Sequence, residues 1–173
     1  MAGCYALFPV PGLTEINITA DSLPQGLGID SQPDLIAVRA PNCLRVDGDL
    51  NYNDAAGFQI SNCPNLATVE FPRATTFSSD VYLNNNALLT SVDLSAATTF
   101  GGNFYLSGNA LTESVVNTLL TMLVAATEAD HVTPWHGTCN LSGGTNEAPT
   151  VGPPDGIAAV GTLTARFAVV TTN

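Results

Sequence analysis

The sequence predicts a β-rich (α/β) solenoid, in which parallel strands form a right-handed stack closed at its C-terminal end by helices. Three observations support this prediction. The first two are a unit that recurs at one spacing and short alternating apolar segments inside each unit. A third is that the repeat stops after Leu111 and helical spacing follows. We therefore expect a single repeat domain over residues 1–173, with an N-terminal arm or cap at 1–12, repeats at 13–111 and a C-terminal cap at 112–173.

The repeat is clearest between residues 66 and 111, where two halves align at a constant offset of 23. Ala-Thr-Thr-Phe occurs at 74–77 and again at 97–100. The other aligned pairs are Val69 with Val92, Phe71 with Leu94, Val81 with Phe104, Leu83 with Leu106, Asn86 with Asn109, and Leu88 with Leu111. So many coincidences at one offset indicate a structural repeat rather than a bias of composition.

Weaker copies of the unit extend towards the N-terminus. Phe58-x-Ile60-x-x-Cys63 repeats the frame of Val81-x-Leu83-x-x-Asn86. Earlier copies are Leu27-x-Ile29 followed by Leu35, and Leu13-x-x-Ile16-x-Ile18. From Leu35 to Leu66 the spacing is 31, so this turn contains an insertion of eight residues, which we place at Leu44–Ala56.

Each unit holds two alternating apolar segments, such as Val69-x-Phe71 and Val81-x-Leu83. Alternation puts these side chains on one face of a strand, and that face is buried only when successive units stack. Cys63, Asn86 and Asn109 then fall on one line, where the asparagines can satisfy backbone groups left open at the end of a strand. We expect these three residues to form a buried structural ladder.

After the repeats, helical and strand signals alternate. Thr112 is a candidate cap for a helix with one apolar face, and Cys139-x-Leu141 reads as a further strand. A second helix is expected after Asp155, and a last strand at Phe167–Val170. The apolar positions are Val116, Leu119, Leu120 and Leu123 in the first helix, and Ile157, Val160 and Leu163 in the second. Such a cap, with a polar outer side, prevents end-to-end stacking.

The motif Val81-x-Leu83-x-x-Asn86-x-Leu88, and its copy from Phe104 to Leu111, resembles the leucine-rich-repeat segment L-x-L-x-x-N/C-x-L. The 23-residue period is similar to leucine-rich repeats of bacterial surface proteins and, more loosely, to receptor L-domains. The ending LSGGTNEAPT…TTN resembles C-terminal caps of such proteins in bacterial and phage genomes. The resemblance covers Phe58–Leu111 best and departs at 44–56. It implies a non-enzymatic protein for protein–protein interaction or assembly.

Charge and composition exclude some partners. The net charge is −11, with no lysine and four arginines, which disfavours nucleic acids and anionic membranes. No apolar run is long enough to span a bilayer, and the segment before Leu13, broken by Pro9 and Pro11, does not predict a signal peptide. With the phage-like ending, these features favour a virion component, either a capsid decoration or a tail-associated protein. Its partners would be proteins: other virion subunits or further copies of this chain. The alternative is an adhesion or interaction module of the bacterial cell surface.

Catalytic patterns are weak, so we expect no enzyme activity and no cofactor. Both histidines lie in one segment, and no nucleophile elbow or phosphate-binding loop is present. His131, His136 and Cys139 are of zinc-ligating type, but their spacing fits no common zinc pattern. Weak candidates for Ca²⁺ are the alternating oxygen side chains Asp47, Asp49, Asn51 and Asn53. They leave open a Ca²⁺-dependent carbohydrate binder, although a polar row that simply faces water is the simpler explanation.

Two surfaces are candidates for binding. Tyr82 and Tyr105 are 23 residues apart and should stack on an exposed sheet, with Asn84 and Asn103 beside them. The alternative is that the tyrosines only stabilise the sheet. The other candidate is an assembly arm in the N-terminal segment, whose apolar residues are Tyr5, Leu7, Phe8 and Val10. Such an arm either closes the first turn or docks on another subunit.

Overall fold

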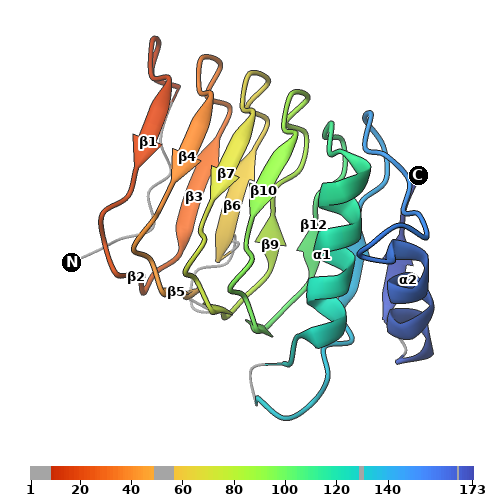
Figure 1. Cartoon of the computed structure of the whole chain (residues 1–173). Coiled ribbons are helices and arrows are strands. Elements are labelled where there is room, and N and C mark those ends of the chain that lie inside the picture. The colour runs from red at the N-terminus through yellow and green to blue at the C-terminus, as the bar shows by residue number, and fades with distance from the viewer. Residues whose placement is uncertain (1–8, 49–56, 129–130, 167) are drawn as a thin grey trace.

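Three parallel sheets and two helices make up the computed structural model, which describes residues 9–48, 57–128, 131–166 and 168–173 (Figure 1). Sheet A has six strands, in spatial order β3 (Leu27–Asp30), β6 (Phe58–Ser61), β9 (Val81–Tyr82), β12 (Phe104–Tyr105), β13 (Thr138–Asn140) and β14 (Val169–Thr171). Sheet B contains β1 (Glu15–Asn17), β4 (Ala37–Arg39), β7 (Thr68–Glu70) and β10 (Ser91–Asp93). Sheet C contains β2 (Ser22–Leu23), β5 (Arg45–Val46), β8 (Thr76–Phe77) and β11 (Thr99–Phe100). The expectation of a β-rich parallel stack with helices is confirmed.

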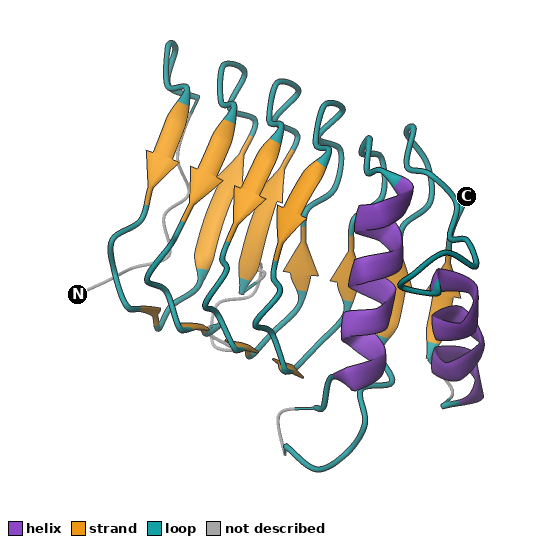
Figure 2. Ribbon diagram, in the orientation of Figure 1, coloured by secondary structure: helices purple, strands orange, loops and turns teal. Residues whose placement is uncertain are grey.

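Each turn of the chain passes through sheet B, then sheet C, then sheet A. In Figure 2 the front strands run downwards and the rear strands upwards while the chain advances from left to right, which is a right-handed path. The sequence predicted two strands per turn. The structure has a third strand in each repeat turn, and these third strands form sheet C. Its strands have two residues each, as in Thr76–Phe77, so they are too short to show alternation.

Strand register shows where the extra residues are accommodated. Val81 pairs with Phe104 and Val69 with Val92, at the offset of 23. Ser22 pairs with Arg45, also at 23, whereas Leu27 pairs with Phe58 at 31. The eight-residue insertion therefore lies between β5 and β6, within the predicted interval, and the sheets remain in register on both sides of it.

The interior is lined by apolar side chains from all three sheets, with aromatic rings at its centre. The rings of Phe77 and Phe100 stack at 5.5 Å between centroids, and Phe58 meets Phe71 edge-on at 4.8 Å. All four are buried. The constant offset of Phe77 and Phe100 places identical side chains above one another, so the repeat builds its own core.

Helix α1 (Glu113–Ala125) lies beyond β10 in the layer of sheet B, and α2 (Gly156–Ala165) lies beside α1 (Figure 1). Thr127 bridges Thr99 next to sheet C, and β13 continues sheet A. Each helix thus replaces the sheet B strand of its turn. None of the helices in the described ranges has the length and apolar character needed to cross a membrane.

Both helices were predicted, and the buried face of α1 is as expected: Val116, Leu119, Leu120 and Leu123 are buried. In α2 the prediction is correct for Leu163, which is buried, and for Val160, which packs against the core, but wrong for Ile157, which is 51 % exposed. The helix packs instead through Gly156, Ala159 and Leu163, whose spacing defines a face rotated away from Ile157. The last strand begins at Val169, two residues later than predicted.

The corner that leads from sheet A to sheet B repeats the same backbone conformation. Ser31, Asn62, Asn85 and Gly108 occupy equivalent positions and have φ of 53°, 57°, 59° and 73°. Asparagine and glycine tolerate this left-handed conformation better than other residues. Each is followed directly by a ladder position, so the corner has the same geometry in each of these turns.

One aligned pair of the sequence analysis is wrong. Leu88 is 54 % exposed, whereas Leu89 and Leu111 are both buried. The Leu89 amide donates to the carbonyl of Asn86 at 2.8 Å, and this turn brings the third residue after the asparagine into the core. The turn after Asn109 is one residue shorter. Leu111, the second residue after Asn109, therefore takes the core position that Leu89, the third residue after Asn86, takes one turn earlier. The resemblance to L-x-L-x-x-N-x-L therefore fails at its last leucine in this turn.

Candidate functional site: the outer face of sheet A

Beneath sheet A, buried asparagines link successive turns. Asn86 accepts from the Cys63 amide through Oδ1 at 2.9 Å, and Asn109 accepts from the Asn86 amide at 2.9 Å. Their Nδ2 groups donate to the carbonyls of Ile60 at 2.9 Å and Leu83 at 2.7 Å. The structure thus places the three predicted ladder residues in line. The side chains link the corners of successive turns at the ends of these strands.

The sequence analysis missed two further members of this line. Gln32 is fully buried, three residues after Ile29 as Asn86 is after Leu83, and its Oε1 accepts from the Val10 amide at 2.9 Å. Asn146 accepts from the Leu111 amide at 2.8 Å and donates to the carbonyl of Leu141. The spacing of Gln32 could have revealed it. Asn146 lies five residues after Leu141, so the repeat frame gave no signal.

The outer face of sheet A carries an uncharged central row. Strand pairing aligns its members as Gly28, Gln59, Tyr82, Tyr105, Asn140 and Thr171. Side chains on either side of this row in the strands, such as Phe58 and Ile60, point into the core. The helices lie on the side of sheet B, so none of the described elements covers this face (Figures 1 and 2).

Tyr82 and Tyr105 stack with ring centroids 4.8 Å apart and planes inclined at 21°. The Tyr82 hydroxyl donates to Oδ2 of Asp80 at 2.9 Å. Burial, and then the hydrogen bond and charge of Asp80, raise the pKa of Tyr82 to about 12. Because the rings stand side by side on neighbouring strands, each covers one face of the other, and their edges point away from the sheet. A flat aromatic platform, of the kind on which a sugar ring stacks, is not formed by this pair.

Asn84 and Asn103, predicted to belong to the binding face, also hold the sheet together. Asn84 Oδ1 accepts from the Ser61 hydroxyl at 3.1 Å. The Asn103 amide donates to Oδ1 of Asp80 at 2.6 Å, and the Asn103 side-chain oxygen accepts from the Thr138 amide at 2.9 Å. Each asparagine therefore cross-links neighbouring turns, and the neutral face is fixed in shape before any partner binds.

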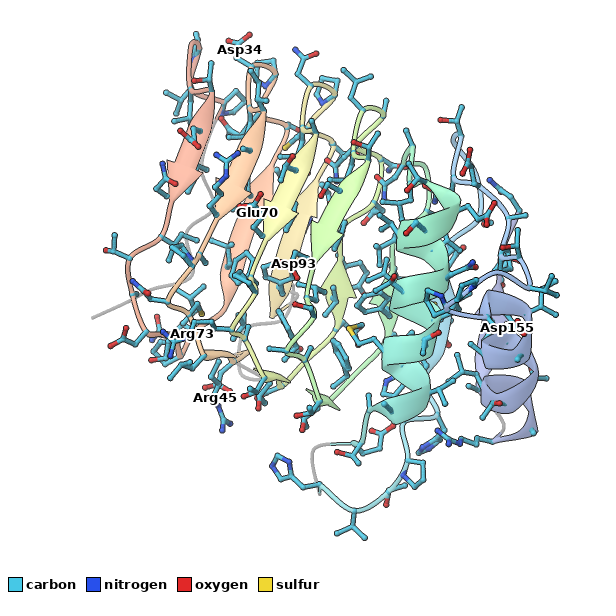
Figure 3. All side chains as sticks on the ribbon, in the orientation of Figure 1. Asp34, Arg45, Glu70, Arg73, Asp93 and Asp155 are labelled. Carbon is cyan, nitrogen blue, oxygen red and sulfur yellow. The ribbon has the colours of Figure 1, made fainter. Side chains whose placement is uncertain are left out.

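Sheet B has a different chemical character. Its outward row contains Asn17, Arg39, Glu70 and Asp93. Arg39 forms ion pairs with Glu15 and with Glu70, the latter at 3.0 Å. In Figure 3, Glu70 and Asp93 lie on neighbouring strands of this front sheet. The central row of sheet B is thus charged, whereas the central row of sheet A is uncharged, with Asp30 and Asp80 beside it.

Of the weak Ca²⁺ candidates, only Asp47 belongs to the described residues. Its Oδ1 accepts from Arg45 Nε and from the Ser78 hydroxyl, each at 2.5 Å. Asp49, Asn51 and Asn53 lie outside the described residues. The Asp47 carboxylate is thus engaged by a cation and a hydroxyl of the protein itself.

The histidines and Cys139 do not come together as zinc ligands. Cys139 is buried, and burial raises the pKa of its thiol to about 12, which disfavours the thiolate that zinc requires. His136 Nδ1 lies 3.2 Å from Glu128 Oε1, and His131 contacts the Thr99 hydroxyl. Within the described ranges, no group of three or more His, Cys, Asp or Glu side chains is arranged to hold a metal ion.

The predicted assembly arm is described only from Pro9. Tyr5, Leu7 and Phe8 lie outside the described residues. Val10 is 43 % exposed, but its amide is bonded to Gln32, and the Gly12 amide donates to Asp34 Oδ2 at 2.7 Å. The segment from Pro9 to Leu13 therefore lies across the first corner of the stack.

The fold and this face define the class: a β-rich, parallel solenoid-like protein with two helices in place of strands. Comparisons with protein-family models, with curated proteins and with solved structures find no match.

Proposed function

We propose that this chain is a non-enzymatic recognition or assembly protein that binds a protein partner through the outer face of sheet A. The observation that carries the proposal is the uncharged row through Tyr82 and Tyr105, which is broad, open and rigid in a chain of net charge −11. A protein partner can cover this row of uncharged side chains, and the Asp80 carboxylate beside it is already hydrogen-bonded to the Tyr82 hydroxyl and to the Asn103 amide. Tyrosine with asparagine, serine and threonine is a composition common at recognition surfaces.

The arrangement of the rings favours a protein over a carbohydrate. The stacked rings of Tyr82 and Tyr105 expose edges and hydroxyls, which suit hydrogen bonding and edge contacts with side chains. The Asp47 carboxylate, the described part of the acidic row, is already paired with Arg45. Both observations weigh against a Ca²⁺-dependent carbohydrate binder.

The setting in which the partner is met is a further proposal, supported by the sequence resemblance alone. We propose a virion component, with a bacterial cell-surface module as the alternative, and the leucine-rich-repeat relationship belongs to the same proposal. Flanking genes for capsid, portal or tail proteins, and the presence of the chain in purified particles, would support the virion. A cluster of secretion or adhesin genes would contradict it.

The binding face is tested with matched arginine substitutions. Gln59→Arg places a large cation in the neutral row, next to Tyr82, whereas Ser91→Arg adds the same charge on the outer face of sheet B. Immobilised wild type and both variants are exposed to particle or cell lysate from the source, and captured proteins are compared by mass spectrometry. We expect Gln59→Arg to lose a partner that the wild type and Ser91→Arg retain.

Two outcomes would contradict the proposal. If Gln59→Arg and a Tyr82→Ser, Tyr105→Ser double variant both retain every wild-type partner, sheet A is not the binding face. If Ser91→Arg alone loses the partner, the site lies on sheet B. Light scattering on the same variants shows whether the partner is a second copy of the chain.

A further inference from the structure

A groove separates β10 from helix α1, at the point where a helix first replaces a strand. Its volume is about 320 Å³, and its apolar walls are formed by Val92 and Leu94 on one side and by Leu119, Met122 and Ala125 on the other. Small-molecule pockets span about 300–1,000 Å³, so this groove suits one or two side chains rather than the surface of a folded domain.

The strand side of the groove is an open sheet edge, because β10 is the last strand of sheet B. The Ser91 amide donates to Ala67 and the Asp93 carbonyl accepts from the Phe71 amide, both on the side of β7. Backbone groups of successive residues in a strand point to opposite sides. The N–H and C=O of Val92 therefore point to the groove, as those of Val69 point to β10.

A carboxylate stands at the rim of the same groove. Asp93 lines it, and its Oδ1 accepts from the Ser95 amide at 3.0 Å. The neighbouring Glu70 is paired with Arg39, whereas no described cation forms an ion pair with Asp93. The protein as a whole carries a net charge of −11. A basic partner is thus attracted over distance and finds an unpaired carboxylate on arrival.

We propose that the β10–α1 groove binds an extended segment of a basic protein partner. One aliphatic side chain of the segment enters between β10 and α1, its backbone bonds to Val92, and the adjacent lysine or arginine pairs with Asp93. The segment runs antiparallel to β10: the residue opposite Val92 then exchanges both backbone hydrogen bonds with Val92 and faces inward, whereas the residue opposite Asp93 faces outward. The mode is strand addition at a sheet edge. This site is separate from the outer face of sheet A.

The probe is a fluorescein-labelled hexapeptide of alternating leucine and lysine with capped ends, measured by fluorescence anisotropy. Thr121→Arg and Ser114→Arg both add one charge to an exposed position of α1, but only Thr121 lines the groove. We expect Thr121→Arg to weaken binding by about tenfold or more and Ser114→Arg by less than about twofold. Asp93→Asn should weaken binding and reduce its dependence on salt, unlike Asp21→Asn at an exposed position away from the groove.

Two modified peptides test the proposal on the wild-type protein, independently of any effect of substitutions on folding. A peptide with glutamate in place of lysine should not bind detectably. A peptide with an N-methyl group on its central leucine should bind about tenfold more weakly, because it cannot donate to the Val92 carbonyl. Equal effects of Thr121→Arg and Ser114→Arg, equal binding of the glutamate peptide, or unchanged binding of the methylated peptide would each overturn the proposal. None of these results bears on sheet A, which Gln59→Arg tests separately.

Discussion

The backbone amide of Asn86 donates to Oδ1 of Asn109, one full turn later in the stack, and the Asn109 amide group donates back to the carbonyl of Leu83. The Asn109 side chain thus binds two backbone groups of the preceding turn, and both asparagines are buried. If this side chain is lost, the Asn86 amide and the Leu83 carbonyl lose these partners. The energetics of the ladder can therefore be tested by single substitutions.

Replacing Asn86 or Asn109 with leucine should lower the free energy of unfolding by about 1–3 kcal/mol per site, because buried backbone groups lose their partners. Asn84 is half-buried, and its side chain accepts from the Ser61 hydroxyl, so this position should tolerate leucine better. Urea denaturation followed by circular dichroism compares the three variants. Equal stabilities of Asn84→Leu and Asn86→Leu would show that the ladder hydrogen bonds do not stabilise the fold more than the bond of Asn84.

Glu147, rather than Thr112, should cap helix α1. The Thr112 side chain makes no capping bond, whereas Glu147 Oε2 accepts from the Glu113 amide at 2.5 Å. Because a carboxylate at a helix N-terminus satisfies an open amide and interacts with the helix dipole, Glu147→Ala should cost about 0.5–2 kcal/mol. Thr112→Ala should change stability by much less. Thermal unfolding measures the stability of both variants. A larger loss of stability in Thr112→Ala than in Glu147→Ala would contradict the assignment of Glu147 as the cap.

Two glycines should respond in opposite directions to alanine. Gly161 lies in α2 with open space around a Cβ, so Gly161→Ala should stabilise by about 0.5–1 kcal/mol. Gly108 has φ of +73°, and a Cβ there would lie 2.7 Å from Asn85 Oδ1, so Gly108→Ala should destabilise. The same denaturation experiment measures both. If Gly108→Ala also stabilised the protein, the corner at Gly108 would have to accommodate a Cβ without strain.

Tyr82 should make stability depend on pH in the alkaline range. Its pKa is raised from 10.0 to about 12 in the folded protein, so the folded state holds its proton more tightly than the unfolded chain. The contribution is complete below pH 10.0 and is lost as pH rises towards about 12. Tyr82→Phe should remove this part of the loss of folding stability at alkaline pH. Asp80→Asn should lower the pH at which Tyr82 titrates, which is measured by tyrosinate absorbance. An unchanged titration in Asp80→Asn would show that Asp80 has no part in the shift.

Sequence predicted best the features that recur. The offset of 23 between Asn86 and Asn109, or between Tyr82 and Tyr105, states directly which residues lie above one another. The repeated Ala-Thr-Thr-Phe segments contain strands of sheet C, but these strands are too short to show the alternation by which a strand is recognised. The capping of α1 by Glu147 joins residues 34 apart at the end of the repeat, where no periodicity relates them. The groove beside β10 arises from substitution of a helix for a strand, and its shape depends on packing that no pattern of residues encodes.

Leu88 illustrates the limit of motif reading in physical terms. The sequence alone permits either Leu88 or Leu89 to follow the asparagine into the core. The choice is made by the corner, since the left-handed Asn85 and the hydrogen bond from the Leu89 amide to Asn86 set the number of residues the turn consumes. The side chain that reaches the core is thus decided by backbone geometry.

The eight residues inserted between β5 and β6 change the length of one turn without shifting any strand, since all three sheets keep their pairing across it. We therefore expect the corner between sheets C and A to accept foreign sequence without loss of strand pairing. An epitope or affinity tag grafted there would be joined at both ends to paired strands. The molecule is in this sense a ready scaffold for presentation, whatever its natural partner is.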